Sequence, residues 1–144
     1  MLLSLEPVAA DDFETLFALR MDAMRDSLLR IGLGDPQRSR ERFTTQFEPR
    51  WMQHIVRDGE RIGFVKLEPM NDGHLHIDHL FIRPGAQGGG VGAWALGWAK
   101  SHRRDLTLSA LKQSDSNRFY QHHGFVQIGE EEFDIQYRWT CASV

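Results

Sequence analysis

The stretch that most constrains this chain is a run of glycines between a strand-like and a helix-like segment. Residues 87–92 read Gln-Gly-Gly-Gly-Val-Gly. A hydrophobic run ends at Ile82 before them, and apolar residues recur at helical spacing from Val91 to Trp98 after them. A loop at a helix start offers unpaired backbone N–H groups and the positive end of the helix dipole. Glycines also let a phosphate come close to the main chain. The sequence therefore predicts a site for a phosphorylated ligand.

The composition is that of an ordinary folded chain. Its 144 residues are 41% hydrophobic and 26% charged, and the formal net charge is −3. This length suits one domain with a single core, so we expect one domain over residues 1–144. The negative net charge argues against a general nucleic-acid binder, which usually carries a basic surface.

Signals for export or membrane insertion are not visible in the sequence. The N-terminal segment carries acids at Glu6, Asp11 and Asp12 and has no basic region before an apolar stretch. No apolar run approaches the ~20 residues that span a bilayer. The single cysteine, Cys141, can form no internal disulfide, which fits a reducing compartment. We expect a cytoplasmic protein with no membrane partner.

Apolar periodicity and turn residues predict a mixed α/β chain. Strands are expected over residues 1–5, 51–57, 61–67, 74–83, 105–112, 125–128 and 133–139. Helices are expected over about 11–29, 38–47, 90–102 and 114–122. The Asp58-Gly59 pair is a strong hairpin signal. Together the elements predict a mixed sheet with helices on both faces.

Two familiar nucleotide motifs fit the glycine loop poorly. A nucleoside-triphosphate loop ends in Gly-Lys-Ser/Thr, but Ala93 and Trp94 follow Gly92 here. A dinucleotide fingerprint can be aligned as Gly88-x-Gly90-x-x-Ala93. That motif opens a βαβ unit with an acid about 20 residues on, and the strand after the helix carries no acid at its C-terminal end. A nicotinamide enzyme therefore remains an alternative without support from its context.

The residues around the loop resemble the GNAT family of N-acetyltransferases. Gln87–Gly92 resembles the family's Gln/Arg-x-x-Gly-x-Gly/Ala signature, and Leu80–Pro84 is similar to the strand and proline that precede it. Residues 117–125 resemble the family's late Tyr-x-x-x-Gly-Phe segment. The order of elements is also similar, so the likeness covers nearly the whole chain. It implies a GNAT-like single domain with a mixed, mostly antiparallel sheet flanked by helices on both faces.

The resemblance implies an acetyl-CoA-dependent N-acetyltransferase in which a primary amine of a small molecule or peptide attacks the thioester directly. The residues expected to bind acetyl-CoA (coenzyme A) are Leu80, Phe81, Ile82, Gln87, Gly88, Gly89, Gly90, Val91, Gly92, Ala93 and Ser114. Ser114 departs from the family pattern, because many members carry Asn near that place. A non-catalytic acyl-CoA-binding or regulatory module on the same fold is the alternative. A homodimer is an assembly that such a chain could form.

Tyr120 matches the family tyrosine that donates a proton to the leaving thiolate. A phenol has a pKa of about 10, above that of a typical thiol, so proton donation depends mostly on positioning. The structural alternative is a core aromatic beside Phe119. For the general base the candidates are Asp78 and His79, with Glu68 behind them, and an ordered water could replace all three.

The histidines around Asp78 raise the question of a metal, because transition metals favour imidazole. On a regular strand Asp78 shares one face with His74 and His76, whereas His79 lies on the other face. A bulge would change this assignment. Three ligands would not converge on one point, so we expect no metal site.

The acceptor is least defined by the sequence. Six arginines lie among acids in or next to the first two predicted helices, namely Arg20, Arg25, Arg30, Arg38, Arg40 and Arg42 beside Asp22, Asp26 and Glu41. Mixed charge of this kind is typical of a solvated helix face. Binding of an anionic acceptor is the alternative interpretation.

Overall fold

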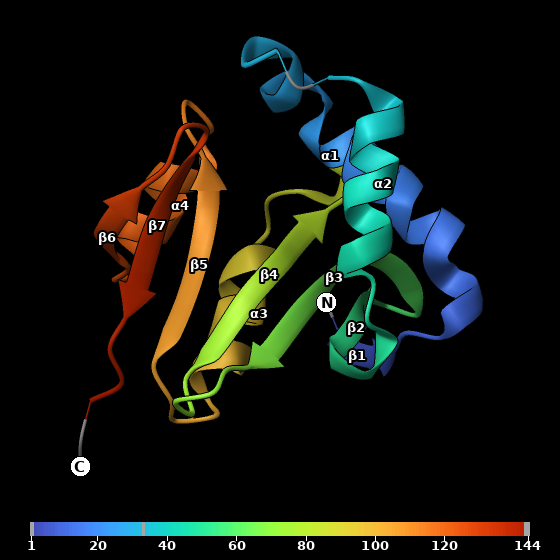
Figure 1. Cartoon of the computed structure of the whole chain (residues 1–144). Helices are drawn as coiled ribbons and strands as arrows, with labels where there is room; N and C mark the ends of the chain where they lie inside the picture. The colour runs from blue at the N-terminus through green and yellow to red at the C-terminus, as the bar shows by residue number, and fades with distance from the viewer. Residues whose placement is uncertain (1, 33, 143–144) are drawn as a thin grey trace. The chain divides into compact units, whose positions relative to one another are not determined.

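The computed structural model describes residues 2–32 and 34–142, so Met1, which the sequence places in the first strand, lies outside these ranges. Its strands are β1 (Leu3–Pro7), β2 (Met52–Arg57), β3 (Glu60–Pro69), β4 (Leu75–Ile82), β5 (Leu106–Leu111), β6 (Val126–Glu130) and β7 (Asp134–Trp139) (Figure 1). Its α-helices are α1 (Phe13–Arg30), α2 (Pro36–Gln46), α3 (Val91–Lys100) and α4 (Ser116–His122). Short 3-10 helices are η1 (Ala10–Asp12), η2 (Pro49–Trp51) and η3 (Pro84–Ala86).

The strands form one sheet in the order β1-β2-β3-β4-β5-β7-β6. The pairs β1–β2, β2–β3, β5–β7 and β6–β7 are antiparallel, whereas β4 and β5 are parallel. A parallel pair needs a crossover connection, and α3 lies between β4 and β5 in the sequence. The predicted mixed, mostly antiparallel α/β sheet is therefore confirmed.

Local chemistry explains where the elements begin. Asp58 and Gly59 have φ angles of 50° and 85°, so the two residues between β2 and β3 form the tight hairpin turn that the sequence predicts. At α2 the Asp35 side chain accepts a hydrogen bond from the Gln37 N–H at 3.0 Å, and Pro36 takes the first helical position. Pro49 likewise begins a 3-10 turn through Trp51, where the sequence predicts strand.

The first of two compact units contains residues 1–66 and 79–92. Its core is aromatic, and the fully buried Phe43 of α2 lies at its centre. The Phe43 ring lies 5.3 Å from that of Phe13 on α1 and 6.1 Å from that of Phe64 on β3. Aromatic pairs at these separations add to the stabilisation from area burial alone. The core thus attaches both N-terminal helices to the sheet.

The second unit contains residues 67–78 and 93–144. Leu106 and Leu108 of β5 are buried, and Leu108 lies opposite the buried Tyr137 of β7. Tyr137 keeps its polar end satisfied, because its hydroxyl donates to Asn117 Oδ1 at 2.8 Å and accepts from Gln121 Nε2 at 3.2 Å. This network connects β7 to α4.

Gly63 marks a close approach between β3 and the end of β4. A Cβ atom at this position would lie 2.2 Å from the carbonyl oxygen of Phe81 and 3.2 Å from the Cα atom of Ile82. Both neighbours are main-chain atoms, so neither can move like the end of a flexible side chain. The Arg83 N–H also donates to the Ile62 carbonyl at 2.8 Å. The absent side chain of Gly63 therefore sets the distance between the two strands.

Gly63→Ala is expected to lower the free energy of unfolding by about 2–3 kcal/mol, because the new methyl group must displace backbone. Gly97→Ala is the matched control. Gly97 lies on the exposed side of α3 with open space around the position of a Cβ, so alanine there should raise the free energy of unfolding by about 0.5–1 kcal/mol. Denaturant titration of the two variants measures both effects. Equal stability of Gly63→Ala and the wild type would contradict the close approach.

Candidate functional site

The glycine loop adopts a conformation that explains its composition. Gly88, Gly89 and Gly90 have φ angles of 89°, 66° and 80°, so three consecutive residues lie in the left-handed region that side chains disfavour. Apart from each glycine and its two chain neighbours, no heavy atom of the described residues lies within 4 Å of the place where a Cβ would stand at any of the three. The backbone geometry requires glycine here, and the space that side chains would fill is open.

The loop presents unbonded N–H groups. Within the described residues, the N–H groups of Gly88, Gly89 and Gly90 donate to no backbone carbonyl. Helix α3 begins immediately after them at Val91, and the first N–H groups of a helix have no partner inside it. All three glycines are exposed. This row of donors at the positive end of a helix dipole can bind an anion such as phosphate.

Gln87 fixes the start of this loop. Its side-chain Nε2 donates to the carbonyl of Ile82, the last residue of β4, at 3.1 Å. The bond ties the loop to the strand that precedes it. In this structure Gln87 therefore supports the loop, while the exposed N–H groups belong to the glycines.

Strand β4 has one buried and one partly exposed face. Leu75, Ile77 and His79 are buried, whereas His76 and Asp78 between them are partly exposed. This alternation agrees with the regular strand that the sequence predicts over these residues. Side chains on the His76 and Asp78 face are the ones that solvent can reach.

One edge of β4 is only partly paired. In the described part of the chain, β5 pairs with Leu75, His76 and Ile77 and no further. The carbonyl of Phe81 points toward β3. The N–H and C=O groups of the preceding residue, Leu80, therefore point to the opposite edge of β4, beyond the last residue that pairs with β5. Leu80, Phe81 and Ile82 therefore offer a short strand edge to which an extended ligand could bind.

The two candidate bases lie in different surroundings. The Asp78 side chain is 24% exposed, and its Oδ1 lies 3.9 Å from His76 Nε2. His79 is only 4% exposed, and its ring packs against those of Phe43 at 5.4 Å and Phe81 at 5.6 Å. An acceptor can approach Asp78 much more easily than His79, whose position is that of a core histidine. Glu68, the third candidate base, is partly exposed at the end of β3.

The Tyr-x-x-x-Gly-Phe segment is the C-terminal cap of α4. The Phe125 N–H donates to the Tyr120 carbonyl at 3.0 Å, and the Gly124 N–H donates to the Gln121 carbonyl at 3.1 Å. Gly124 has a φ of 89°, and the rings of Tyr120 and Phe125 are in contact at 5.8 Å. These features make up a Schellman motif with its accompanying hydrophobic contact. The spacing in the sequence thus fixes the position of Tyr120 at the end of the helix.

Tyr120 is buried, and its hydroxyl has no hydrogen-bond partner among the described residues. It is 8% exposed and packs between Phe119 and Phe125. Its hydroxyl makes no hydrogen bond to any residue that the structure describes, whereas that of Tyr137 both donates and accepts. Desolvation by burial raises the pKa of Tyr120 to about 12. The side chain is therefore neutral at physiological pH and can act only as a donor or neutral acceptor.

Ser114 lies in the turn before α4. Its Oγ accepts from Asn117 Nδ2 at 3.3 Å, and the same Nδ2 donates to the Leu111 carbonyl at 2.8 Å. Since Asn117 Oδ1 is bound by Tyr137, both ends of that amide are occupied inside the protein. Asn117 is a structural residue, whereas Ser114 remains partly exposed.

The division into units separates the expected site residues. Leu80–Ile82, His79 and the loop through Gly92 belong to the first unit, while Asp78, Ala93, Ser114 and Tyr120 belong to the second.

Sequence reasoning missed one group in the second unit, the hydroxyl of Thr107. Thr107 of β5 bonds both His74 and His76, and only the parallel register that places His76 beside Thr107 could have revealed it.

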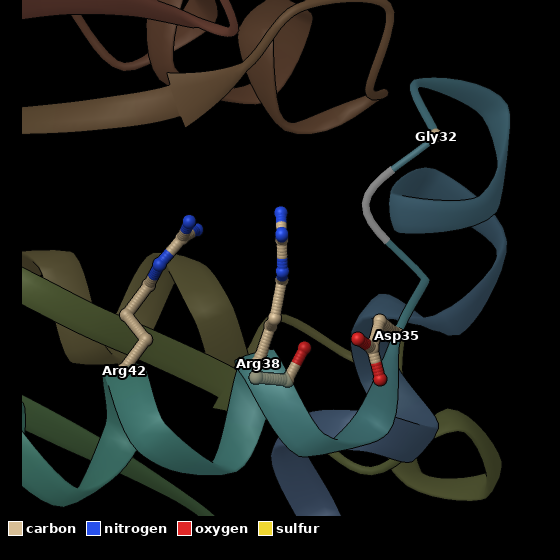
Figure 2. A pocket seen from close by; sticks show the side chains of 5 residues that line it. Gly32, Asp35, Arg38 and Arg42 are labelled. Atoms are coloured by element: carbon tan, nitrogen blue, oxygen red, sulfur yellow. The ribbon is translucent and has the colours of Figure 1, made fainter.

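A pocket of about 190 Å³ lies at the start of α2 (Figure 2). It is lined by Gly32, Asp35, Arg38, Ser39 and Arg42. Arg38 and Arg42 are one helical turn apart and extend from the same side of α2 (Figure 2). Neither has a carboxylate partner among the described residues, in contrast to Arg40, which pairs with Glu14. Two such guanidinium groups side by side suit a carboxylate or phosphate.

The described residues contain neither a metal-binding cluster nor a membrane-spanning helix. No three His, Cys, Asp or Glu side chains there are grouped so that they could hold a metal ion. None of the described helices is long and apolar enough to cross a membrane.

Solved structures of similar fold cover all or nearly all of the chain. The PaiA N-acetyltransferase of Thermoplasma acidophilum, solved in complex with coenzyme A, has 14% identity and a TM-score of 0.74 over 97% of this chain and 99% of its own. An acetyltransferase of Thermus thermophilus has 21% identity and a TM-score of 0.74 over 97% of both chains. Apo YjaB of Escherichia coli has 20% identity and a TM-score of 0.76 over 100% of both chains. At these identities the likeness establishes the fold.

The family follows from the sequence itself. No curated protein matches the chain. The family model of the acetyltransferase (GNAT) domain matches residues 51–127, which is more than half of the chain and includes the glycine loop and Tyr120. The chain therefore belongs to the GNAT acetyltransferase family.

Proposed function

We propose that the chain is an acetyl-CoA-dependent N-acetyltransferase that transfers an acetyl group to a primary amine by direct attack on the thioester. The observation that carries this proposal is the loop of three exposed, left-handed glycines before α3, whose N–H groups donate to no backbone carbonyl of the described residues. The complex of the Thermoplasma relative with coenzyme A supports the choice of ligand.

The residues of the loop and of β4 fit coenzyme A. The N–H groups from Gly88 to Gly92 would hold the diphosphate, with the dipole of α3 behind them. The edge of β4 at Leu80, which lies beyond the last β5 pair that the structure describes, would bind the amides of the pantetheine arm as an added strand does. A backbone N–H on this edge would also polarise the thioester carbonyl. The bound cofactor supplies the activated acetyl group.

Tyr120 would assist departure of the thiolate. A thiol has a pKa of roughly 8.5, so full proton transfer from a phenol whose pKa is about 12 would cost about 5 kcal/mol. The hydroxyl is therefore better suited to donate a hydrogen bond that strengthens as charge develops on sulfur. Its lack of a partner among the described residues leaves the hydroxyl available for this role.

Of the two candidate bases on β4, Asp78 is the one that an acceptor can approach, and its carboxylate would attract the ammonium group of the acceptor. It lies on the partly exposed face of β4, two residues before the strand edge at Leu80. An ammonium group must lose its proton before it can attack a carbonyl, and a carboxylate at this position would attract the ammonium and orient it. His79 would need to leave its aromatic packing to do the same.

An acceptor screen that follows release of free thiol from acetyl-CoA tests the proposed function. Amines, amino acids, aminoglycosides and peptides belong in it, and amines that bear a carboxylate or phosphate should come first because of Arg38 and Arg42. Turnover with any amine supports the proposal. A rise in melting temperature with NAD(H) and none with coenzyme A would overturn it, because a ligand that binds the native state stabilises it. Stabilisation by coenzyme A without turnover on any amine would favour the non-catalytic acyl-CoA-binding module.

Gly89→Ala should weaken coenzyme A binding about tenfold or more, because alanine disfavours the left-handed conformation and its methyl group enters the space meant for the phosphates. Gly85→Ala is the control, since Gly85 lies nearby with ordinary φ and open space. Calorimetric titration measures both affinities. Equal affinities of the two variants would show that the diphosphate binds elsewhere.

Tyr120→Phe should lower kcat on the order of a hundredfold while the KM for acetyl-CoA changes little, because the hydroxyl acts in the transition state. Tyr137→Phe is the matched control. It removes a hydroxyl with two hydrogen bonds and should cost about 1 kcal/mol of stability while kcat is retained. Steady-state kinetics of the two folded variants measures kcat and the KM for acetyl-CoA. Full turnover by Tyr120→Phe would remove the donor role.

A further inference from the structure

A chain of hydrogen bonds runs across one face of β4 and β5 in the second unit. His74 Nδ1 bonds Asp72 Oδ1, and His74 Nε2 lies 3.1 Å from the hydroxyl oxygen of Thr107. The same hydroxyl lies 2.8 Å from His76 Nδ1, and His76 Nε2 lies 3.9 Å from Asp78 Oδ1. Two imidazoles thus share one hydroxyl, and each has a carboxylate at its far end.

The fold builds this arrangement from simple periodicities. His74, His76 and Asp78 are two residues apart and share one face of the strand. The parallel register sets Thr107 of β5 beside His76. Asp72 lies in the turn before the strand, where its Oδ1 also accepts from the His74 backbone N–H at 3.1 Å. The order along the face is therefore carboxylate, imidazole, hydroxyl, imidazole, carboxylate.

When both histidines are neutral, one set of hydrogen-bond directions satisfies all the short contacts, since the 3.9 Å between His76 Nε2 and Asp78 Oδ1 is too long for a hydrogen bond. The Asp72 carboxylate can only accept, so His74 carries its proton on Nδ1 and presents the Nε2 lone pair to Thr107. The Thr107 hydroxyl then donates to His74 and accepts from Nδ1–H of His76. His76 is left with its Nε2 lone pair on the side of Asp78.

Addition of one proton at His76 Nε2 reverses the directions of the two hydrogen bonds at Thr107, while His74 Nδ1–H continues to donate to Asp72. His76 passes its Nδ1 proton to Thr107, and Thr107 passes its own proton to His74 Nε2. His74 becomes the cation and is paired with Asp72, while the new N–H of His76 faces Asp78. One proton enters at His76 and one positive charge appears at His74, so the step is balanced.

The charges around the chain favour this direction. The backbone and side-chain hydrogen bonds from His74 lower the pKa of Asp72, and Arg138 adds to this, so Asp72 stays a carboxylate. Arg138 is itself paired with Asp105 at 2.8 Å, which reduces its repulsion of a cationic His74. The Asp72 side chain is 65% exposed, so a proton that reaches His74 has a short route to solvent.

We propose that His76 takes the proton of the acceptor amine and that Thr107 and His74 relay it toward Asp72 and solvent. This inference rests on the proposed acetyl transfer and names the path by which its proton leaves. His76 would be the catalytic base, and the Asp78 carboxylate would stabilise the proton that His76 Nε2 gains. Thr107 and His74 are relay residues that do not touch the acceptor.

Thr107→Val and Thr107→Ser test the relay as a matched pair. Valine keeps the branched shape that suits β5 but removes the hydroxyl, whereas serine keeps the hydroxyl. We expect kcat to fall about tenfold or more in Thr107→Val and to stay within about threefold of wild type in Thr107→Ser. The solvent isotope effect on kcat should change in the valine variant alone. Wild-type kcat in a folded Thr107→Val variant would overturn the relay but would not contradict the proposed acetyl transfer.

Nitrogen NMR of the histidine rings tests the bond directions independently of turnover. Near pH 8 the wild type should show both His74 and His76 with their proton on Nδ1, and the valine variant should lose this fixed pattern at His76. A wild-type His76 that carries its proton on Nε2 while His74 is neutral would overturn the proposed direction. This measurement needs no acceptor, so it separates a wrong relay from a wrong function.

Discussion

The alternation of side chains along β4 is the constraint on which the rest of the site depends. One face buries Leu75, Ile77 and His79, which leaves His76 and Asp78 on the face that solvent reaches. The strand ends at Ile82, whose carbonyl accepts the hydrogen bond from Gln87 that fixes the start of the glycine loop. A shift of one residue in the register of β4 would bury the acid and expose the core. Both the proposed base and the proposed cofactor-binding edge therefore depend on this single periodicity.

Glycine performs three different physical tasks in this fold. Gly63 permits two backbones to approach closely, and no side chain fits there whatever its conformation. Gly88, Gly89 and Gly90 supply three left-handed residues with open space above them. Gly124 ends α4 and thereby positions Tyr120. Only the first task concerns stability alone, and the other two place groups that the proposed chemistry needs.

The sequence predicted the sheet and the loop because their signals are local. Turn residues such as Asp58-Gly59 and the run of glycines act within a few positions of the chain. Which face of β4 is buried depends on the aromatic core around Phe43, so His79 could not be distinguished from Asp78 as a candidate base. The link from His76 to Thr107 needs a parallel pairing across 31 positions of the chain, and no local pattern predicts such a register.

The proposed acetyl transfer depends on binding of the diphosphate of coenzyme A by the N–H groups of the glycine loop. Amide NMR spectra recorded during titration with coenzyme A and with pantetheine, which lacks the diphosphate, test this binding without an acceptor. Coenzyme A should shift the amide signals of Gly88, Gly89 and Gly90 strongly, whereas pantetheine should leave them nearly unchanged. Saturable binding of coenzyme A that leaves these three amides unaffected would show that the diphosphate does not bind to the loop.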